Sequence, residues 1–123
     1  METKKVLIID DDKVLSDMLV QEFSKYQINT ITARNAVEGL DMITNQKPDL
    51  VIADIMMPGE SGLDLIEAVR KIPEIKNTFF VVLTNSSKTY DVAKAMTNKV
   101  TIFLQKSSVD PSTVVDMVKG YLK

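Results

Sequence analysis

The stretch of sequence that decides the fold is LVIADIMMPGESG, residues 50–62. It begins with the apolar run Leu50–Ala53, and a short apolar run bounded by turn residues is typical of a fully buried β-strand. Asp54 ends the run, and the proline and glycines behind it indicate a turn. In open α/β sheets, ligands bind outside the carboxyl ends of the strands. The stretch therefore predicts a buried strand that presents the carboxylate of Asp54 at a functional edge.

On both sides of this stretch, short apolar runs alternate with segments of helical periodicity, which predicts strands joined by helices. We predict strands at Lys4–Ile9, Ile28–Ala33, Leu50–Ala53, Thr78–Leu83 and Val100–Leu104. Apolar stripes at helical spacing predict which side chains of the helices face the core: Leu15, Leu19 and Phe23; Val37, Leu40 and Ile43; Leu63, Ile66 and Val69; and Val114, Val115, Val118 and Leu122. Parallel strands joined by helical crossovers give helices on both faces of the sheet. The predicted fold is α/β, a three-layer, doubly wound, flavodoxin-like domain with a five-stranded parallel sheet and five helices.

Polar side chains follow four of the predicted strands. Asp10 and Asp11 follow the first strand, Asp54 the third, Thr84 the fourth and Lys106 the fifth. In the strand order 2-1-3-4-5, which we take from flavodoxin-like sheets, the ligand crevice opens between strands 1 and 3. These side chains are therefore expected to gather at one crevice.

Carboxylates gathered in one crevice repel one another and favour a bound cation. Mg²⁺ prefers oxygen ligands, and it usually binds one or two carboxylates together with water and phosphate oxygens. We predict Asp11 and Asp54 as direct ligands, Asp10 as a ligand through water, and the backbone carbonyl of Met56 as the remaining protein ligand. The predicted cofactor is Mg²⁺.

Lys106 and Thr84 offer a positive charge and a hydroxyl donor, which suit the oxygens of a phosphoryl group in transfer. A carboxylate can be the nucleophile and form an aspartyl phosphate. Asp54 is the predicted acceptor, because it is the lone acid on its strand and the Asp10–Asp11 pair suits the metal. Since the chain has no glycine-rich phosphate loop, we expect another protein or a small phosphodonor, not a nucleotide, to supply the phosphoryl group.

The length and composition limit the number of domains, the possible chemistry and the possible partners. The 123 residues suffice for one core, so we expect a single domain over residues 1–123. The absence of cysteine and histidine excludes disulfides, thiolate chemistry, Cys/His zinc sites and histidine-based acid/base catalysis. A net charge of −2 gives no reason to expect nucleic acid binding. Neither a signal peptide nor a membrane-spanning run is recognisable, so we predict a cytoplasmic protein without a membrane partner.

These residues resemble the pattern of the receiver domains of two-component response regulators, and the resemblance covers essentially all 123 residues. The family carries an acidic pair, an acceptor aspartate followed by proline and glycine, a threonine or serine after the fourth strand and a lysine after the fifth. The matching residues are Asp10 and Asp11; Asp54 with Pro58 and Gly62; Thr84; and Lys106.

The resemblance implies a signalling phosphoacceptor that receives its phosphoryl group from a histidine kinase or a histidine phosphotransfer protein and catalyses its own phosphorylation and dephosphorylation. It also implies that Thr84 moves toward the phosphoryl group and that Phe103 rotates inward behind it. Both changes are expected to switch a surface on the fourth helix, fifth strand and fifth helix, where an output protein or domain binds.

Some positions depart from the family pattern. Ser107 follows Lys106 where the family usually has proline, and because a cis bond before another residue costs roughly 2.5 to 4 kcal/mol, we predict a trans bond. Asn85 stands where the family has a small residue, and we expect its bulk to slow phosphorylation and hydrolysis. Lys99 replaces the usual glycine before the fifth strand, and we expect neighbouring Asn98 to supply the left-handed conformation.

Other functions stay open at this point. The altered peptide after Lys106 suggests a pseudo-receiver that only binds protein. The Asp10-x-Asp12 arrangement suggests a haloacid-dehalogenase-type phosphatase, although Val14 stands where such enzymes have a hydroxyl side chain. A flavodoxin needs a phosphate-binding loop that the first strand–helix turn lacks. Val14 and Met18 form an apolar pair on the first helix, which we assign to core packing over docking of a phosphodonor.

Overall fold

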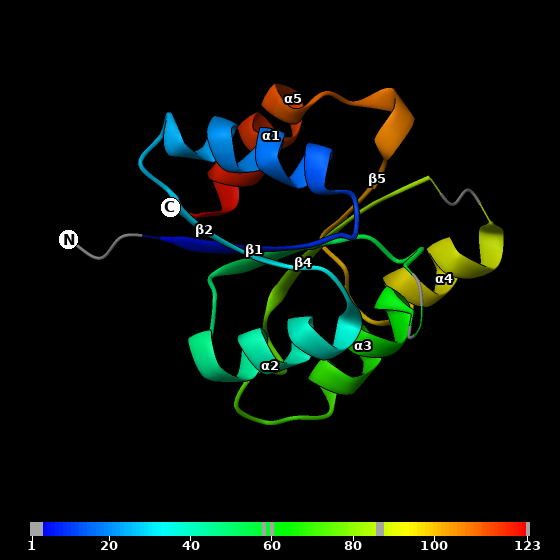
Figure 1. The fold of residues 1–123 in the computed structure, drawn as a ribbon. Coiled ribbons are helices and arrows are strands. Elements are labelled where there is room, and N and C mark those ends of the chain that lie inside the picture. The colour runs from blue at the N-terminus through cyan, green and yellow to red at the C-terminus, as the bar shows by residue number, and fades with distance from the viewer. Residues whose placement is uncertain (1–3, 58, 60, 86–87, 123) are drawn as a thin grey trace.

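The computed structural model describes residues 4–57, 59, 61–85 and 88–122, and these form a five-stranded sheet between two layers of helices (Figure 1). The strand order is β2-β1-β3-β4-β5, and every ladder is parallel. The strands are β1 (Lys5–Ile9), β2 (Asn29–Ala33), β3 (Leu50–Ala53), β4 (Phe79–Thr84) and β5 (Ile102–Gln105). The predicted flavodoxin-like fold and its strand order are confirmed.

The helices divide between the two faces of the sheet. They are α1 (Lys13–Ser24), α2 (Ala36–Gln46), α3 (Gly62–Arg70), α4 (Thr89–Thr97) and α5 (Pro111–Lys119), with short 3₁₀ turns η1 (Lys106–Ser108) and η2 (Gly120–Leu122). Figure 1 shows α1 and α5 above the sheet and α2, α3 and α4 below it. Each layer has its own apolar cluster, because alternate strand residues point to opposite faces. In β1, Val6 and Ile8 pack with α1 and α5, whereas Leu7 and Ile9 pack with α2 and α3.

Side-chain caps begin α1, α2 and α5 in the loops that follow β1, β2 and β5. Asp12 accepts from the backbone N–H of Leu15 at 3.1 Å, and Asn35 and Asp110 cap α2 and α5 in the same way. Such a cap satisfies an N–H that has no partner within the helix. The caps therefore fix where each helix starts relative to the carboxyl edge of the sheet.

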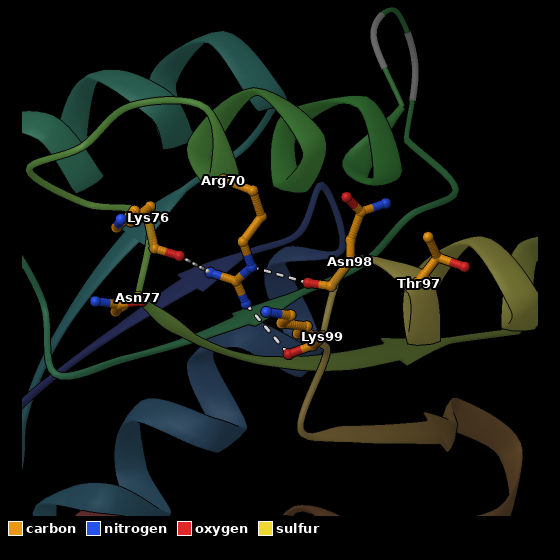
Figure 2. Close-up of a pocket in the computed structure, with 6 residues that line it drawn as sticks. All are labelled: Arg70, Lys76, Asn77, Thr97, Asn98 and Lys99. Carbon is orange, nitrogen blue, oxygen red and sulfur yellow. Dashed lines mark hydrogen bonds between the residues drawn. The ribbon is translucent and has the colours of Figure 1, made fainter.

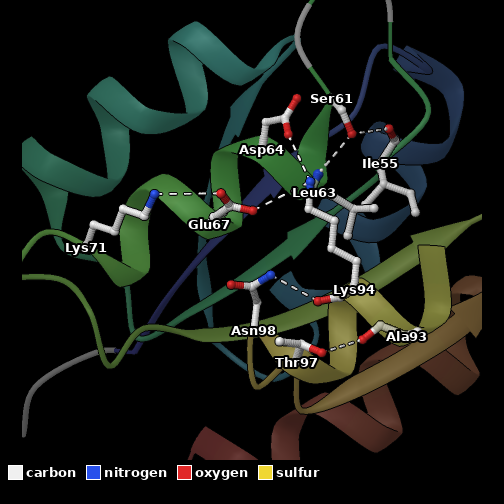
Figure 3. A network of polar contacts seen from close by, with 10 residues as sticks. All are labelled: Ile55, Ser61, Leu63, Asp64, Glu67, Lys71, Ala93, Lys94, Thr97 and Asn98. Carbon is white, nitrogen blue, oxygen red and sulfur yellow. Dashed lines mark hydrogen bonds and ion pairs between the residues drawn. The ribbon is translucent and has the colours of Figure 1, made fainter. Parts of the chain in front are cut away.

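The turn after β3 depends on Gly62. A Cβ atom at this position would lie 2.4 Å from the backbone oxygen of Asp54, so no other residue fits without moving the backbone. Ser61 precedes it, caps α3 by accepting from the N–H of Leu63 at 3.1 Å, and donates to the carbonyl of Ile55 at 3.4 Å (Figure 3). The close approach holds the start of α3 against the segment that carries Asp54.

Helix α4 is held to α3 largely by charge. Lys94 lies 3.2 Å from Asp64 and 3.5 Å from Glu67, both on α3 (Figure 3). Among the α4 side chains that the structure describes, only Ala95 is buried. The helix therefore has little apolar anchorage of its own.

The predicted core stripe of the second helix is wrong at Val37, which is 71% exposed. Ala36, Gly39 and Ile43 face the sheet instead. A Cβ atom on Gly39 would lie 2.6 Å from Cδ1 of Ile9, so this helix lies too close to β1 for larger side chains. The stripes of the third and fifth helices are confirmed, although η2, not α5, carries Leu122. On α1, Val14 and Met18 are 70% and 44% exposed, so their assignment to the core is wrong.

The fifth strand begins two residues later than predicted, at Ile102. The N–H of Val100 donates to the carbonyl of Ala95, so Val100 belongs to the turn that ends α4, and the N–H of Thr101 donates to the carbonyl of Phe80 on β4 just before β5 begins. The other predicted strands agree within one residue at each end. No helix in the described ranges is long and apolar enough to cross a membrane.

The left-handed residue before β5 is Lys99, with φ of 60°, and not Asn98 as predicted. Asn98 has φ of −90°, because its N–H still donates to the carbonyls of Lys94 and Ala95 as the helix ends. The chain reversal therefore falls on the next residue. The bond between Lys106 and Ser107 is trans, as predicted, since the described residues contain no cis peptide.

Candidate functional site

The candidate site lies at the carboxyl edge of the sheet, where backbone hydrogen bonds hold the acidic residues in line. The N–H of Asp10 donates to the carbonyl of Ala33 at 3.0 Å, and that of Asp54 donates to the carbonyl of Ile9 at 2.9 Å. These bonds continue the sheet beyond β1 and β3, so the two aspartates stand side by side.

Lys106 joins the two aspartates. Its Nζ lies 2.8 Å from Oδ2 of Asp54 and 2.9 Å from Oδ2 of Asp10. The lysine side chain is 14% exposed and each carboxylate 4%. Charges so well buried need partners, because desolvation costs more than an isolated ion can recover. Lys106, Asp10 and Asp54 therefore form one buried unit, which we call the ion-pair centre.

Backbone N–H groups orient both carboxylates. Oδ1 of Asp10 accepts from the N–H of Asp12 at 2.9 Å, and Oδ1 of Asp54 accepts from the N–H of Met56 at 2.9 Å. Asp54 thus turns one oxygen to the backbone and the other to Lys106, whereas Lys106 lies within hydrogen-bond distance of both oxygens of Asp10, 3.1 Å from Oδ1 and 2.9 Å from Oδ2.

Burial and neighbouring charges in the ion-pair centre shift the pKa of Asp10 and the pKa of Lys106. Burial raises the pKa of Asp10, against the opposing effects of the Asp12 hydrogen bond and Lys106. Burial by itself lowers the pKa of Lys106, but its hydrogen bonds and attraction to Asp54 and Asp10 outweigh this and raise the pKa. The lysine is therefore charged at neutral pH.

Asp10, Asp11 and Asp54 offer one carboxylate oxygen each, and these oxygens lie within 4.8 Å of one another. Asp10 and Asp54 are buried and Asp11 is exposed. The donors are all hard oxygens, as Mg²⁺ requires, and a cation there would offset the mutual repulsion of the acids. The residues therefore fit the predicted metal.

The other predicted residues lie around this centre. Thr84 ends β4 and is fully buried. Phe103, on β5, is half-buried and packs against the cluster under α2 and α3. Met56 lies three residues after the end of β3 and has an exposed side chain. Asn85 is exposed, while Pro58 lies outside the described residues.

A hollow that the sequence did not reveal adjoins Lys106. The side chains of Val14, Leu15 and Met18 on α1 line it on one side, and Asn85 and Ser107 line it on the other. The exposed apolar pair on α1 thus borders the ion-pair centre. Only the long-range packing of α1 against the loop after β5 brings these residues together.

The sequence model of the response regulator receiver domain matches residues 6–119. The chain belongs to this family. The resemblance seen in the sequence is thereby confirmed, and the assignment to two-component signalling leaves no support for the flavodoxin and phosphatase alternatives.

Two relatives agree with a receiver domain. The chain is 32% identical over 115 residues to the regulator of RpoS of Escherichia coli, which covers 94% of this chain and 34% of that protein. It is 32% identical over 84 residues to sporulation initiation phosphotransferase F of Bacillus subtilis, which covers 68% of this chain and 66% of that protein. The receiver domain thus spans about a third of the length of the first relative.

Solved structures show the same fold. A CheY-like response regulator receiver domain protein from Methanospirillum hungatei has a TM-score of 0.90 and 24% identity, with 98% of this chain and 94% of that chain covered. The chemotaxis response regulator CheY4 of Vibrio cholerae has a TM-score of 0.87 and 23% identity, with 98% and 99% covered. At this identity the likeness supports the receiver fold alone.

Proposed function

We propose that residues 1–123 form one receiver domain that accepts a phosphoryl group on Asp54 from a histidine kinase or a histidine phosphotransfer protein. The observation that carries the proposal is the ion-pair centre, in which Lys106 bridges Asp54 and Asp10. A lysine fixed beside the acceptor is already in place for the negative charge of an incoming phosphoryl group, so little reorganisation is needed during transfer.

In the proposed transfer, a carboxylate oxygen of Asp54 attacks the phosphorus atom of a phosphohistidine. An O–P bond forms, the N–P bond breaks, and its electron pair returns to the imidazole nitrogen, which takes up a proton. Water later cleaves the aspartyl phosphate, releasing inorganic phosphate and restoring the carboxylate. The domain thus promotes its own phosphorylation and dephosphorylation and acts on no separate substrate.

We assign Asp11, Asp54 and the carbonyl of Met56 as ligands of Mg²⁺, with Asp10 acting through water. When bound, Mg²⁺ offsets charge on the phosphoryl oxygens. The ammonium group of Lys106 would bind one phosphoryl oxygen, and the hydroxyl of Thr84 would donate to another. The side chain of Asn85 stands at the open side of the centre, where its bulk slows the approach of the donor and of water.

The proposed signal leaves through α4, β5 and α5. Thr84 ends the strand that leads to α4, and Phe103 lies on β5 and packs against the cluster under α2 and α3. Helix α4 is suited to move, because ion pairs of Lys94 hold it to α3 and few apolar contacts do. An output protein or domain is the partner of this surface, which on α4 exposes Tyr90 and Met96.

The phosphodonor is proposed to dock beside the centre, over the hollow bordered by Val14 and Met18. Exposed apolar side chains next to a reactive group suit a protein donor, which buries them on contact. We place this exchange in the cytoplasm, with neither nucleic acid nor membrane as a direct partner of this chain.

Intact-protein mass spectrometry after incubation with acetyl phosphate and Mg²⁺ tests the proposal. We expect the mass of one phosphoryl group on the wild-type chain and none on Asp54→Asn. An unmodified wild-type chain that also shows no Mg²⁺-dependent response to beryllofluoride would favour the pseudo-receiver instead. Asn85→Ala is expected to label faster than wild type, and equal rates would remove the proposed role of Asn85.

A further inference from the structure

A second polar hollow lies at the amino edge of the sheet, far along the strands from Asp54. It has a volume of about 250 Å³ and is lined by Arg70, Lys76, Asn77, Thr97, Asn98 and Lys99 (Figure 2). The lining contains positively charged and neutral polar side chains and no carboxylate. We propose that this hollow binds a small multivalent anion, such as the pyrophosphate group of a phosphorylated metabolite.

Arg70 lies at the centre of the hollow. Its Nε donates to the carbonyl of Asn98 at 2.8 Å, Nη1 to the carbonyls of Lys76 and Thr78 at 2.8 Å, and Nη2 to that of Lys99 at 3.2 Å. A guanidinium has five N–H donors, so one N–H of Nη2 is left for a ligand. Figure 2 shows the backbone carbonyls converging on this group, between Lys76 and Lys99.

The charge of Arg70 has no acidic counterpart in the described part of the chain. Its guanidinium is partly buried, and this burial lowers its pKa. The carbonyl oxygens around it and the ring of Phe80, whose centroid lies 5.2 Å from Cζ, stabilise the positive charge but supply no negative charge to neutralise it. An anion that accepts from the remaining N–H would compensate it.

Lys76 and Lys99 add two further charges without ion pairs to the acids that the structure describes. Six other lysines do pair with acids: Lys13, Lys25, Lys71, Lys94, Lys106 and Lys119. The whole chain carries a net charge of −2, so this gathering of unpaired positive charge is local. The hollow is therefore selective for anions in a chain that otherwise repels them.

The backbone conformation at Lys99, which Gln27 and Lys47 also adopt, does not itself require a lysine. Its φ of 60° lies in the left-handed region, which glycine adopts freely and which is unfavourable for a lysine. The carbonyl of this residue bonds Arg70, and the same bond is available to a glycine. What the lysine adds is a charge on the wall of the hollow.

The size of the hollow limits the ligand. Sites for drug-sized molecules span roughly 300 to 1,000 Å³, and this hollow is smaller. Its lining has no aromatic side chain on which a base could stack. The phosphate groups of a ligand are therefore what the hollow recognises. The carbonyls that end α4 would repel an anion, but Arg70 already bonds those of Asn98 and Lys99.

The test is an NMR titration of the ¹⁵N-labelled wild-type chain with pyrophosphate, in EDTA so that no metal draws the anion to the acidic centre. We expect saturable shifts of the amides of residues 76–78 and 97–100 and none around Asp54. Lys76→Gln and Lys99→Gly are each expected to weaken binding about fivefold at low salt, because each removes one charge near the anion. Lys99→Gly also keeps the turn, so its effect reports the charge and not the fold.

Lys25→Gln is the matched control, because it removes the same charge from the far end of α1 and should leave the affinity unchanged. Equal weakening by Lys25→Gln and Lys76→Gln, or no shift at millimolar pyrophosphate, would overturn the proposal. A titration with ADP compares free pyrophosphate with the diphosphate group of a nucleotide. Binding as strong as that of pyrophosphate supports recognition of phosphates alone, whereas binding of ADP without binding of pyrophosphate contradicts it. Asp54→Asn should bind as wild type, so the result is independent of phosphorylation.

Discussion

The two edges of the sheet each hold a partly buried cation, but the two cations have different partners. At the carboxyl edge, Lys106 pairs with the carboxylates of Asp54 and Asp10. At the amino edge, the hydrogen bonds of Arg70 go to backbone carbonyls, which tie the end of α3 to the loops before β4 and β5, and its guanidinium lies over the ring of Phe80, 5.2 Å from the ring centroid. The ion pairs of Lys106 can rearrange when a ligand brings new charge. The hydrogen bonds from Arg70 to backbone carbonyls instead hold in place the loops to which those carbonyls belong. The contrast suits the first edge to the proposed phosphoryl transfer, whereas at the second edge Arg70 holds loops in place.

Removing the lysine of the ion-pair centre should have the largest effect on stability. Lys106→Met is expected to lower the free energy of unfolding by about 2 to 4 kcal/mol at pH 7, because it leaves two buried carboxylates without a cation. Urea unfolding measures this loss. Adding Asp10→Asn should recover part of it. If Lys106→Met were as stable as wild type, the ion-pair centre would not be the tightly coupled unit described above.

Arg70→Met should be less damaging, with a loss of about 2 kcal/mol in urea unfolding, because water can replace part of the lost bonding to carbonyls near the surface. Amide hydrogen exchange should rise in the turn at residues 98–101. Labelling by acetyl phosphate should be retained, since Arg70 lies at the opposite edge of the sheet from Asp54. Loss of labelling in a folded Arg70→Met chain would contradict the division between the two edges.

The pH dependence of stability tests the effect of burial on Asp10 at the carboxyl edge. Burial raises the pKa of Asp10 above 3.8, so its contribution to stability is complete below pH 3.8 and is lost as the pH rises through the folded-state pKa. Asp10→Asn stays neutral throughout. Its stability relative to wild type should therefore increase from pH 3.8 toward neutral pH, as urea unfolding at a series of pH values would show. A difference that stays constant with pH would contradict the raised pKa.

The smallest effect is expected at Lys99, and it has the opposite sign. Lys99→Gly removes the unfavourable left-handed conformation of a lysine, which outweighs the added freedom of the unfolded chain. We expect a gain of about 0.5 to 1 kcal/mol in urea unfolding. Asn98→Gly serves as the control and should destabilise, because φ of Asn98 is −90°. A loss of stability in Lys99→Gly would mean that the lysine side chain itself stabilises the turn.

The sequence alone predicts the carboxyl edge well, because its residues follow short strands that are apolar on both faces. β3 begins and ends where the apolar run does, and Asp54 follows it. The partner of Lys106 is less predictable. That Lys106 reaches Asp10 as well as Asp54 depends on packing between segments 96 residues apart, which no local pattern contains.

Two sequence predictions are wrong for local reasons: the core stripe through Val37 and the left-handed conformation of Asn98. The helical spacing of apolar residues predicts a core stripe through Val37, but α2 lies so close to β1 that Gly39 and Ala36 face the sheet. Asparagine tolerates the left-handed region better than lysine, yet the last hydrogen bonds of α4 keep Asn98 helical and leave the reversal to Lys99. In both places the geometry of neighbouring elements outweighs the preference of the residue.

Locating the phosphoryl group tests the central claim most directly. An aspartyl phosphate is reduced by borohydride to homoserine, so peptide mass spectrometry after phosphorylation and reduction identifies the modified residue. We predict homoserine at position 54 alone, only when Mg²⁺ is present, and strongly diminished in Lys106→Met. Homoserine at position 10 or 11, or none at position 54 in a chain that carries a phosphoryl group, would contradict the assignment of Asp54 as the acceptor.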